Sequence, residues 1–142
     1  MPDKHGVVAL LPAPDGRHLF IRRGWSLPRA PGVWCFVGGE VEAGETYAEA
    51  VVREVREEVG LAVRAGEPFH ESLSPNGEFR LHWLRVELLD AEAAVTPHPQ
   101  EVAEFRWLTF AEALALEPML PTLRAWLEEA ARGQAGGGPG GK

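Results

Sequence analysis

The sequence predicts an α/β domain, and three observations support that class. Strand-length apolar runs recur along the chain, helical segments with amphipathic spacing interrupt them, and turn-forming residues separate most of these pieces. A chain of 142 residues is one domain by the usual range of lengths and can bury a sizeable core. We expect residues 1–132 to form that domain and the Gly-rich residues 133–142 to form a flexible tail.

Composition and charge exclude several classes of protein. The net charge is −7, which argues against a polymeric nucleic-acid partner because such partners need a basic face. No apolar stretch is long enough to span a bilayer, and the first residues lack the pattern of a signal peptide. Cys35 is the sole cysteine, so no intrachain disulfide forms. We therefore expect a cytoplasmic protein without a membrane partner.

Six segments have the composition and length of strands. A turn at Pro12–Gly16 predicts that the first two form a hairpin, and Asn76-Gly77 is a strong signal for a second hairpin. The third segment runs directly into Gly38-Gly39, where two glycines allow close approach of a ligand to the backbone. The predicted strands are residues 7–11, 18–22, 33–37, 62–72, 79–89 and 104–108.

Three helices are predicted, and the first is the longest. Thr46 is its expected N-cap, Glu49 completes a capping box, and Gly60 is the expected C-terminal stop. A short helix follows Thr109, and a final amphipathic helix comes after Pro121. The predicted ranges are 46–59, 110–116 and 122–132. The stripe expected to face the core in the first helix comprises Ala48, Val51, Val52, Val55 and Val59.

Another face of the first helix carries Glu54, Glu57 and Glu58, at i, i+3 and i+4. Like charges at this spacing oppose helix formation by roughly 0.2–0.5 kcal/mol per pair. Arg53, four residues before Glu57, can hold one carboxylate, and a divalent cation such as Mg²⁺ or Mn²⁺ would offset the rest. Taken alone, these residues are more typical of a solvated acidic face.

The stretch from Gly39 to Leu61 resembles the signature of the Nudix hydrolases, G-x5-E-x7-R-E-U-x-E-E-x-G-U, in which U is aliphatic. Seven fixed identities coincide by chance at on the order of 10⁻⁸ per window or less. The resemblance implies an α/β/α sandwich, with a mixed sheet flanked by helices, and an enzyme that hydrolyses a phosphoanhydride of a nucleoside diphosphate linked to another group. The specified positions are occupied by Gly39, Glu45, Arg53, Glu54, Val55, Glu57, Glu58, Gly60 and Leu61.

The resemblance also implies roles for single residues. Glu54, Glu57, Glu58 and the carbonyl of Gly38 would hold Mg²⁺, with Mn²⁺ as a substitute, while Arg53 orients the carboxylates. The base that deprotonates the attacking water is either Glu57 or a glutamate on a distant loop. Glu101, six residues before Trp107, is the expected candidate on that loop, and Glu104 is its rival.

Three residues are predicted to contact the substrate. Arg23 ends a predicted strand before a Gly/Pro-rich loop, where related enzymes carry an arginine that clamps phosphate; a solvated strand-end charge is the alternative. Phe79 is a candidate for base stacking, with core packing as the alternative. Leu120 lies near the place where MutT-type enzymes carry the asparagine that reads oxidised guanine, so specificity for 8-oxo-dGTP is in doubt.

The chain looks most similar to the MutT-like branch, which implies that a (d)NTP is cleaved to monophosphate and pyrophosphate. An ADP-ribose or nucleotide-sugar pyrophosphatase is the alternative, because such enzymes often carry a proline after the signature and Pro75 is at a comparable place. A regulatory nucleotide-binding module without catalysis is a third hypothesis, which the complete signature disfavours. The expected partner is a small nucleotide, and a homodimer is left open.

Overall fold

The computed structural model describes residues 4–137 and contains two sheets and three helices in that range. One sheet is mixed, with the order β4-β1-β6-β5, and the other is antiparallel, with the order β3-β2-β7. The elements are β1 Lys4–Leu10, β2 His18–Arg23, β3 Trp34–Cys35, β4 Gly38–Glu40, α1 Tyr47–Val59, β5 Val63–Leu73, β6 Phe79–Leu88, β7 Val102–Leu108, α2 Phe110–Ala113 and α3 Pro121–Gly137.

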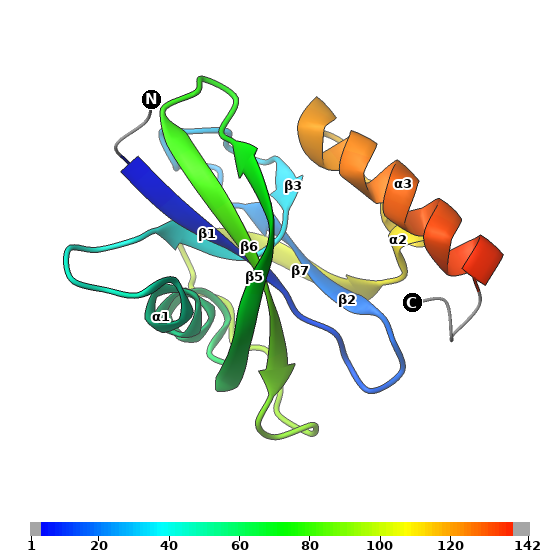
Figure 1. Cartoon of the computed structure of the whole chain (residues 1–142), viewed down its shortest axis with the longest axis horizontal. Coiled ribbons are helices and arrows are strands. Elements are labelled where there is room, and N and C mark those ends of the chain that lie inside the picture. The colour runs from blue at the N-terminus through cyan, green and yellow to red at the C-terminus, as the bar shows by residue number, and fades with distance from the viewer. Residues whose placement is uncertain (1–3, 138–142) are drawn as a thin grey trace.

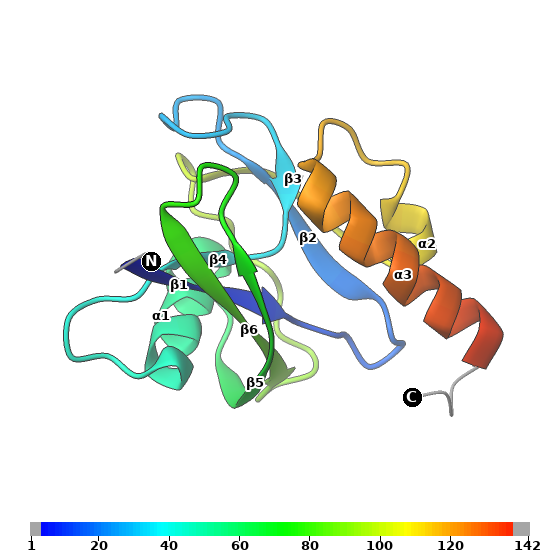
Figure 2. The same ribbon diagram turned by 45° about the horizontal axis from the view of Figure 1, so that its top comes forward.

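The helices cover opposite sides of the strands (Figure 1). Helix α1 packs against the mixed sheet, while α2 and α3 lie together on the far side, next to β2 and β3 in the turned view (Figure 2). Both sides of β1 are buried: Val7 and Ala9 belong to the cluster around α1, and Leu10 belongs to the cluster around α3. A strand covered on both faces explains the unbroken apolar run that predicted it. The predicted sandwich of helices around a mixed sheet is confirmed.

The predicted pairing of the first strands is wrong. β1 and β2 are joined by the expected turn, but they separate into different sheets and remain bridged only near Pro12 and His18. The predicted strand 33–37 forms only in part, as β3 at Trp34–Cys35, and β4 follows beyond it at Gly38–Glu40. β3 pairs with β2, whereas β4 pairs with β1, so the chain crosses between the sheets at this point. That crossing brings Gly38 and Gly39 to the edge of the mixed sheet, facing α1.

Helix α1 begins and ends as the sequence predicts. The Thr46 hydroxyl accepts from the backbone N–H of Glu49, and the Glu49 carboxylate accepts from the N–H of Thr46. Gly60 closes the helix in the left-handed conformation, with φ of 70°. One expectation for its core face is wrong, because Ala48 is exposed and Ala50 is buried in its place. The buried face of α1 also includes two of the predicted site glutamates, Glu54 and Glu58.

Helix α3 is longer than predicted and extends to Gly137. The first residues of the expected tail, from Gly133, therefore continue the helix, and residues 138–142 lie outside the described part of the chain. The division into a domain and a flexible tail stays a prediction. None of the helices among residues 4–137 is long and apolar enough to cross a membrane.

Candidate active site

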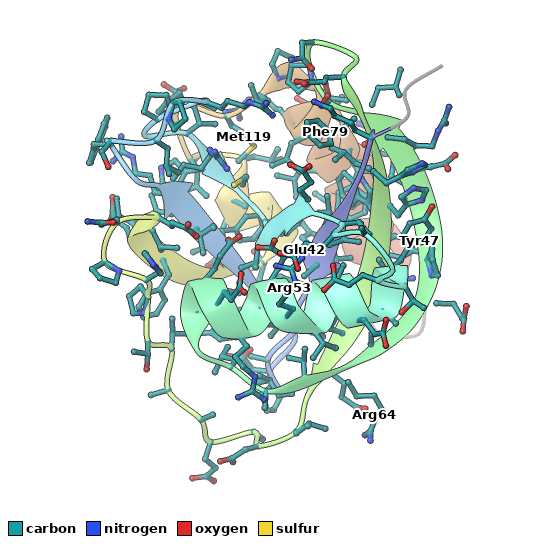
Figure 3. The ribbon with its side chains drawn as sticks, turned by 90° about the vertical axis from the view of Figure 1, so that its left-hand side faces the viewer. Glu42, Tyr47, Arg53, Arg64, Phe79 and Met119 are labelled. Carbon is teal, nitrogen blue, oxygen red and sulfur yellow. The ribbon has the colours of Figure 1, made fainter. Side chains whose placement is uncertain are left out.

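Arg53 is the centre of the candidate site, and its side chain lies between α1 and the preceding segment that carries Glu42 (Figure 3). Its Nε and Nη2 atoms bind both carboxylate oxygens of Glu45, at 2.6 and 3.0 Å. Nη2 also donates to the carbonyl of Glu40, at 2.9 Å. Nη1 donates to Glu54 at 3.1 Å and to Glu57 at 3.2 Å. The predicted orienting role of Arg53 agrees with these contacts, because one planar guanidinium ties the loop before α1 to the helix.

The contact with Glu45 is the strongest element of this arrangement. The hydrogen bond to Glu45 is the largest cause of the raised pKa of Arg53, and the same bond lowers the pKa of Glu45. The Glu45 carboxylate also accepts from the backbone N–H of Glu42, at 2.9 Å. Glu45 therefore links the loop 40–46 to Arg53 on α1.

The carboxyl group of Glu54 packs directly against the backbone of Gly39. A Cβ atom at residue 39 would lie 2.3 Å from the carboxyl carbon of Glu54 and 2.3 Å from its Oε2 atom. At Gly38 a Cβ would lie 2.3 Å from the carbonyl oxygen of Val7. Real contacts of this kind do not fall below about 3 Å, so a side chain at residue 38 would meet fixed backbone, and a side chain at residue 39 would displace the carboxyl group of Glu54. The two glycines thus let the carboxyl group of α1 rest directly on the backbone of β4.

Glu54 and Glu58 form a buried pair. Each is at most 9% exposed, and a hydrogen bond joins their carboxyl groups. Burial raises the pKa of Glu54 and that of Glu58, and for Glu58 the shared bond and the charge of Glu54 add to the effect. Two buried carboxyls this close cannot both ionise without a cation. The pair therefore holds a proton or a positive ion.

Glu57 departs from the expected convergence of three carboxylates. Its side chain is exposed and turns to Arg53 rather than toward Glu54 and Glu58. Among residues 4–137 no three His, Cys, Asp or Glu side chains are grouped as a metal site in this arrangement. The chemistry of the pair nevertheless fits Mg²⁺, which prefers carboxylate and carbonyl oxygens and would replace the shared proton. The residues that would hold it are Glu54 and Glu58, with Glu57 and the Gly38 carbonyl as the further predicted ligands.

The loop before β7 brings Glu101 toward this pair. A backbone hydrogen bond holds this loop against the end of α1, because the N–H of His98 donates to the carbonyl of Glu58, at 2.8 Å. The carboxylate of Glu101 is close enough to Glu58 to contribute to its raised pKa. Glu104, the rival candidate, is held elsewhere by Arg22 and Arg106, at 3.1 and 3.4 Å. The structure thus brings Glu101, and not Glu104, to the predicted site.

Arg23 lies on the other side of the pair, at the end of β2. Its guanidinium lowers the pKa of Glu58 and contacts the thiol of Cys35. Its Nε also donates to the carbonyl of Arg29 in the following loop, at 3.1 Å. Burial raises the pKa of Cys35 to about 12, so this thiol is not an activated nucleophile. The position of Arg23 is consistent with its predicted contact to phosphate, and no pattern in the sequence predicts that Cys35 is its neighbour.

An apolar cavity of about 110 Å³ opens next to Cys35, between the two sheets and the start of α3. Val8 lies on its wall, one strand away from Gly38, with which it pairs. Leu120, one of the predicted substrate residues, also lines the cavity. The full lining comprises Val8, Cys35, Phe36, Ser72, Leu73, Pro75, Leu81, Trp83, Leu120, Thr122 and Leu123.

Phe79, the third predicted substrate residue, is not part of that lining. Its side chain is 7% exposed, and the cationic groups of Lys4 and Arg29 lie over the ring at 5.5 and 5.3 Å. The alternative of core packing describes this environment better than base stacking does. Sequence reasoning missed Ser72, because it belongs to no motif and only the pairing of β5 with β6 brings it to Trp83.

Known proteins share this fold and the signature. A sequence model of the NUDIX domain matches residues 3–130, and the chain therefore belongs to the NUDIX family. A Mycobacterium tuberculosis protein, provisionally named 8-oxo-dGTP diphosphatase 2, is 34% identical over 108 residues, covering 74% of this chain and 73% of that protein. The predicted family and the prediction of a Nudix enzyme are confirmed.

Two further comparisons define the range of the resemblance. The crystal structure of MutT protein from Methanosarcina mazei Go1 matches with a TM-score of 0.78 at 25% identity, over 92% of this chain and 94% of that one. An isopentenyl-diphosphate Delta-isomerase of Klebsiella pneumoniae is 31% identical over 113 residues, covering 73% of this chain and 61% of that protein. These relatives carry names of different reactions, so similarity alone does not select a substrate.

Proposed function

We propose that this protein hydrolyses nucleoside triphosphates, with Mg²⁺, to a nucleoside monophosphate and pyrophosphate. The observation that carries the proposal is that Arg23 links the buried glutamate pair to the cavity beside Cys35. The buried pair Glu54 and Glu58 suits a phosphate-bound cation, and the apolar cavity beside Cys35 suits a flat base. Arg23 lies at their junction, touching Cys35 and facing Glu58. The name of the Mycobacterium tuberculosis relative, which contains the triphosphate 8-oxo-dGTP, supports the same class of substrate.

The residues of the site have separate roles in the proposed reaction. Bound Mg²⁺ would neutralise phosphate charge and lower the pKa of a water molecule. Arg23 binds phosphate oxygens, and Arg53 holds Glu54 and Glu57 in position without touching the substrate. An exposed carboxylate, that of Glu57 or Glu101, takes a proton from water. The water oxygen forms a bond to phosphorus, the anhydride P–O bond breaks, and pyrophosphate or monophosphate leaves with the electron pair.

The lining of the cavity bears on which base is bound. No carboxylate or amide side chain lines it, and Leu120 contributes an apolar surface. Reading an oxidised guanine by a side-chain amide or carboxylate is therefore not supported for this chain, despite the name of the relative from Mycobacterium tuberculosis. We infer that the protein accepts several bases, because an apolar wall recognises shape more than hydrogen-bonding pattern.

A substrate panel tests the proposal. The purified protein is incubated with Mg²⁺ and with common and oxidised (d)NTPs, ADP-ribose, a nucleotide sugar and isopentenyl diphosphate, and products are separated by chromatography. The proposal predicts monophosphate and pyrophosphate from several triphosphates. Cleavage of ADP-ribose or a nucleotide sugar alone would contradict the substrate class. Isomerisation without hydrolysis, or thermal stabilisation by nucleotides without turnover, would contradict hydrolysis itself.

A further inference from the structure

The polar group that the cavity offers in a fixed orientation is the hydroxyl of Ser72. This residue is near the end of β5, and the indole Nε1–H of Trp83 on β6 donates to its Oγ atom at 3.0 Å. Both side chains line the cavity, and Ser72 pairs across the strands with Leu81, which lines it too. Trp83 itself is buried, with 5% of its surface exposed. The hydrogen bond between them is therefore part of the cavity wall.

This bond decides how Ser72 meets a ligand. A serine hydroxyl has one hydrogen to donate and two lone pairs that accept. The indole N–H occupies one lone pair, and among residues 4–137 the hydroxyl hydrogen has no acceptor. A ligand atom that accepts a hydrogen bond would satisfy that hydrogen, whereas a ligand amino group would bind the second lone pair and leave the hydroxyl hydrogen without an acceptor. Ser72 is thus oriented to donate.

The other polar groups on the wall do not have this fixed direction. The Cys35 thiol is a weak donor and is engaged by Arg23. Thr122 is exposed at the start of α3, and its hydroxyl can turn to donate or to accept. The remaining lining residues are apolar or, like Trp83, directed to Ser72. Discrimination between bases by hydrogen bonding therefore falls mainly to Ser72.

We propose that Ser72, oriented by Trp83, is a specificity-determining residue that favours bases carrying a ring oxo group over bases carrying an amino group at the same carbon. This inference rests on the proposed function, since it places the base in the cavity. A single neutral hydrogen bond contributes about 0.5–1.5 kcal/mol, which corresponds to a preference of about twofold to twelvefold. The preference is modest and is compatible with an enzyme that accepts several bases.

Two matched pairs of substrates measure the preference for an oxo group over an amino group. Inosine and adenosine triphosphates differ by oxo against amino at one ring carbon, and so do uridine and cytidine triphosphates. The proposal predicts that the oxo member of each pair has the higher kcat/KM in the wild type, by about threefold to tenfold. Equal values within both pairs, or a preference for the amino members, would overturn it.

Variants of Ser72 assign the preference to the hydroxyl. Ser72→Thr and Ser72→Val have nearly the same shape, and both suit a strand, but only threonine keeps the hydroxyl. The preference should persist in Ser72→Thr and disappear in Ser72→Val. If it persists in Ser72→Val, the assignment is wrong. If thermal melting shows that Ser72→Val does not fold, Trp83→Phe is the second variant. It removes the indole N–H that orients the Ser72 hydroxyl and should narrow the preference. An unchanged preference in Trp83→Phe would also overturn the proposal.

The outcomes separate this inference from the proposed function. If none of the four triphosphates is hydrolysed, the proposed function fails and this inference fails with it. If all four are hydrolysed with equal kcat/KM, the function stands and only the role of Ser72 is refuted.

Discussion

Replacing Gly39 with alanine tests whether the contact between Gly39 and the Glu54 carboxyl positions the buried pair of glutamates. The added Cβ would lie 2.3 Å from the Glu54 carboxyl, while ordinary contacts begin near 3.4 Å, so the carboxyl must move by about 1 Å. The obstructing atoms are the end of a flexible side chain, and no left-handed φ is required at residue 39. The fold should therefore survive. A displacement of about 1 Å at a reacting group costs about a hundredfold in rate.

The assay is the steady-state rate of pyrophosphate release from the best triphosphate, with Mg²⁺, alongside thermal unfolding. Gly39→Ala should lower kcat by about a hundredfold and change the unfolding temperature little. Gly133→Ala is the matched control, because a Cβ there meets nothing within 4 Å. It lies within α3 and should keep full activity. A Gly39→Ala variant with wild-type kcat would refute the reasoning that Glu54 must rest on β4.

Three further predictions follow from the contacts around the site and the core. Arg53→Lys should lower kcat by on the order of a hundredfold with a smaller change in KM, because an ammonium group cannot reproduce the bidentate contact with Glu45. An unchanged kcat in this variant would contradict the assignment. Glu101→Gln should lower kcat at least tenfold, roughly, while Glu104→Gln leaves it unchanged, and the reverse result would reassign the base. His18, whose buried Nδ1 atom has no partner among the described residues, has a pKa lowered from 6.5 to about 4 by burial. Its unfolded form gains a proton below pH 6.5 and its folded form does not until about pH 4, so stability should fall by up to about 3 kcal/mol across this window. Urea unfolding at several pH values should show a shallower fall for His18→Gln than for the wild type, and parallel curves would contradict the assignment.

The sequence predicts the local features of the site well. The capping box at Thr46, the stop at Gly60 and the contact of Arg53 with Glu57 all depend on residues close in the chain. Spacing along a helix is enough to predict them. It does not predict that Glu54 and Glu58 are buried, because their burial comes from packing against β4.

Features that depend on distant segments were beyond sequence reasoning. The run 33–37 looks like one strand, but it crosses from one sheet to the other, and nothing in its composition marks the crossing. The contact of Arg23 with Cys35 and the bond between Trp83 and Ser72 likewise depend on strand pairing and register. A propensity-based assignment also ended the last helix at Arg132, whereas α3 continues into the glycines.

The central claim is that the buried pair Glu54 and Glu58 holds the cation on which hydrolysis depends. Pyrophosphate release from the best triphosphate, measured against Mg²⁺ concentration, tests it most directly in wild type, Glu58→Gln and a surface control, Glu92→Gln. The account predicts that Glu58→Gln folds normally but loses at least about a hundredfold in turnover, while Glu92→Gln matches the wild type. A folded Glu58→Gln protein with near-normal turnover and the same Mg²⁺ dependence would contradict the claim.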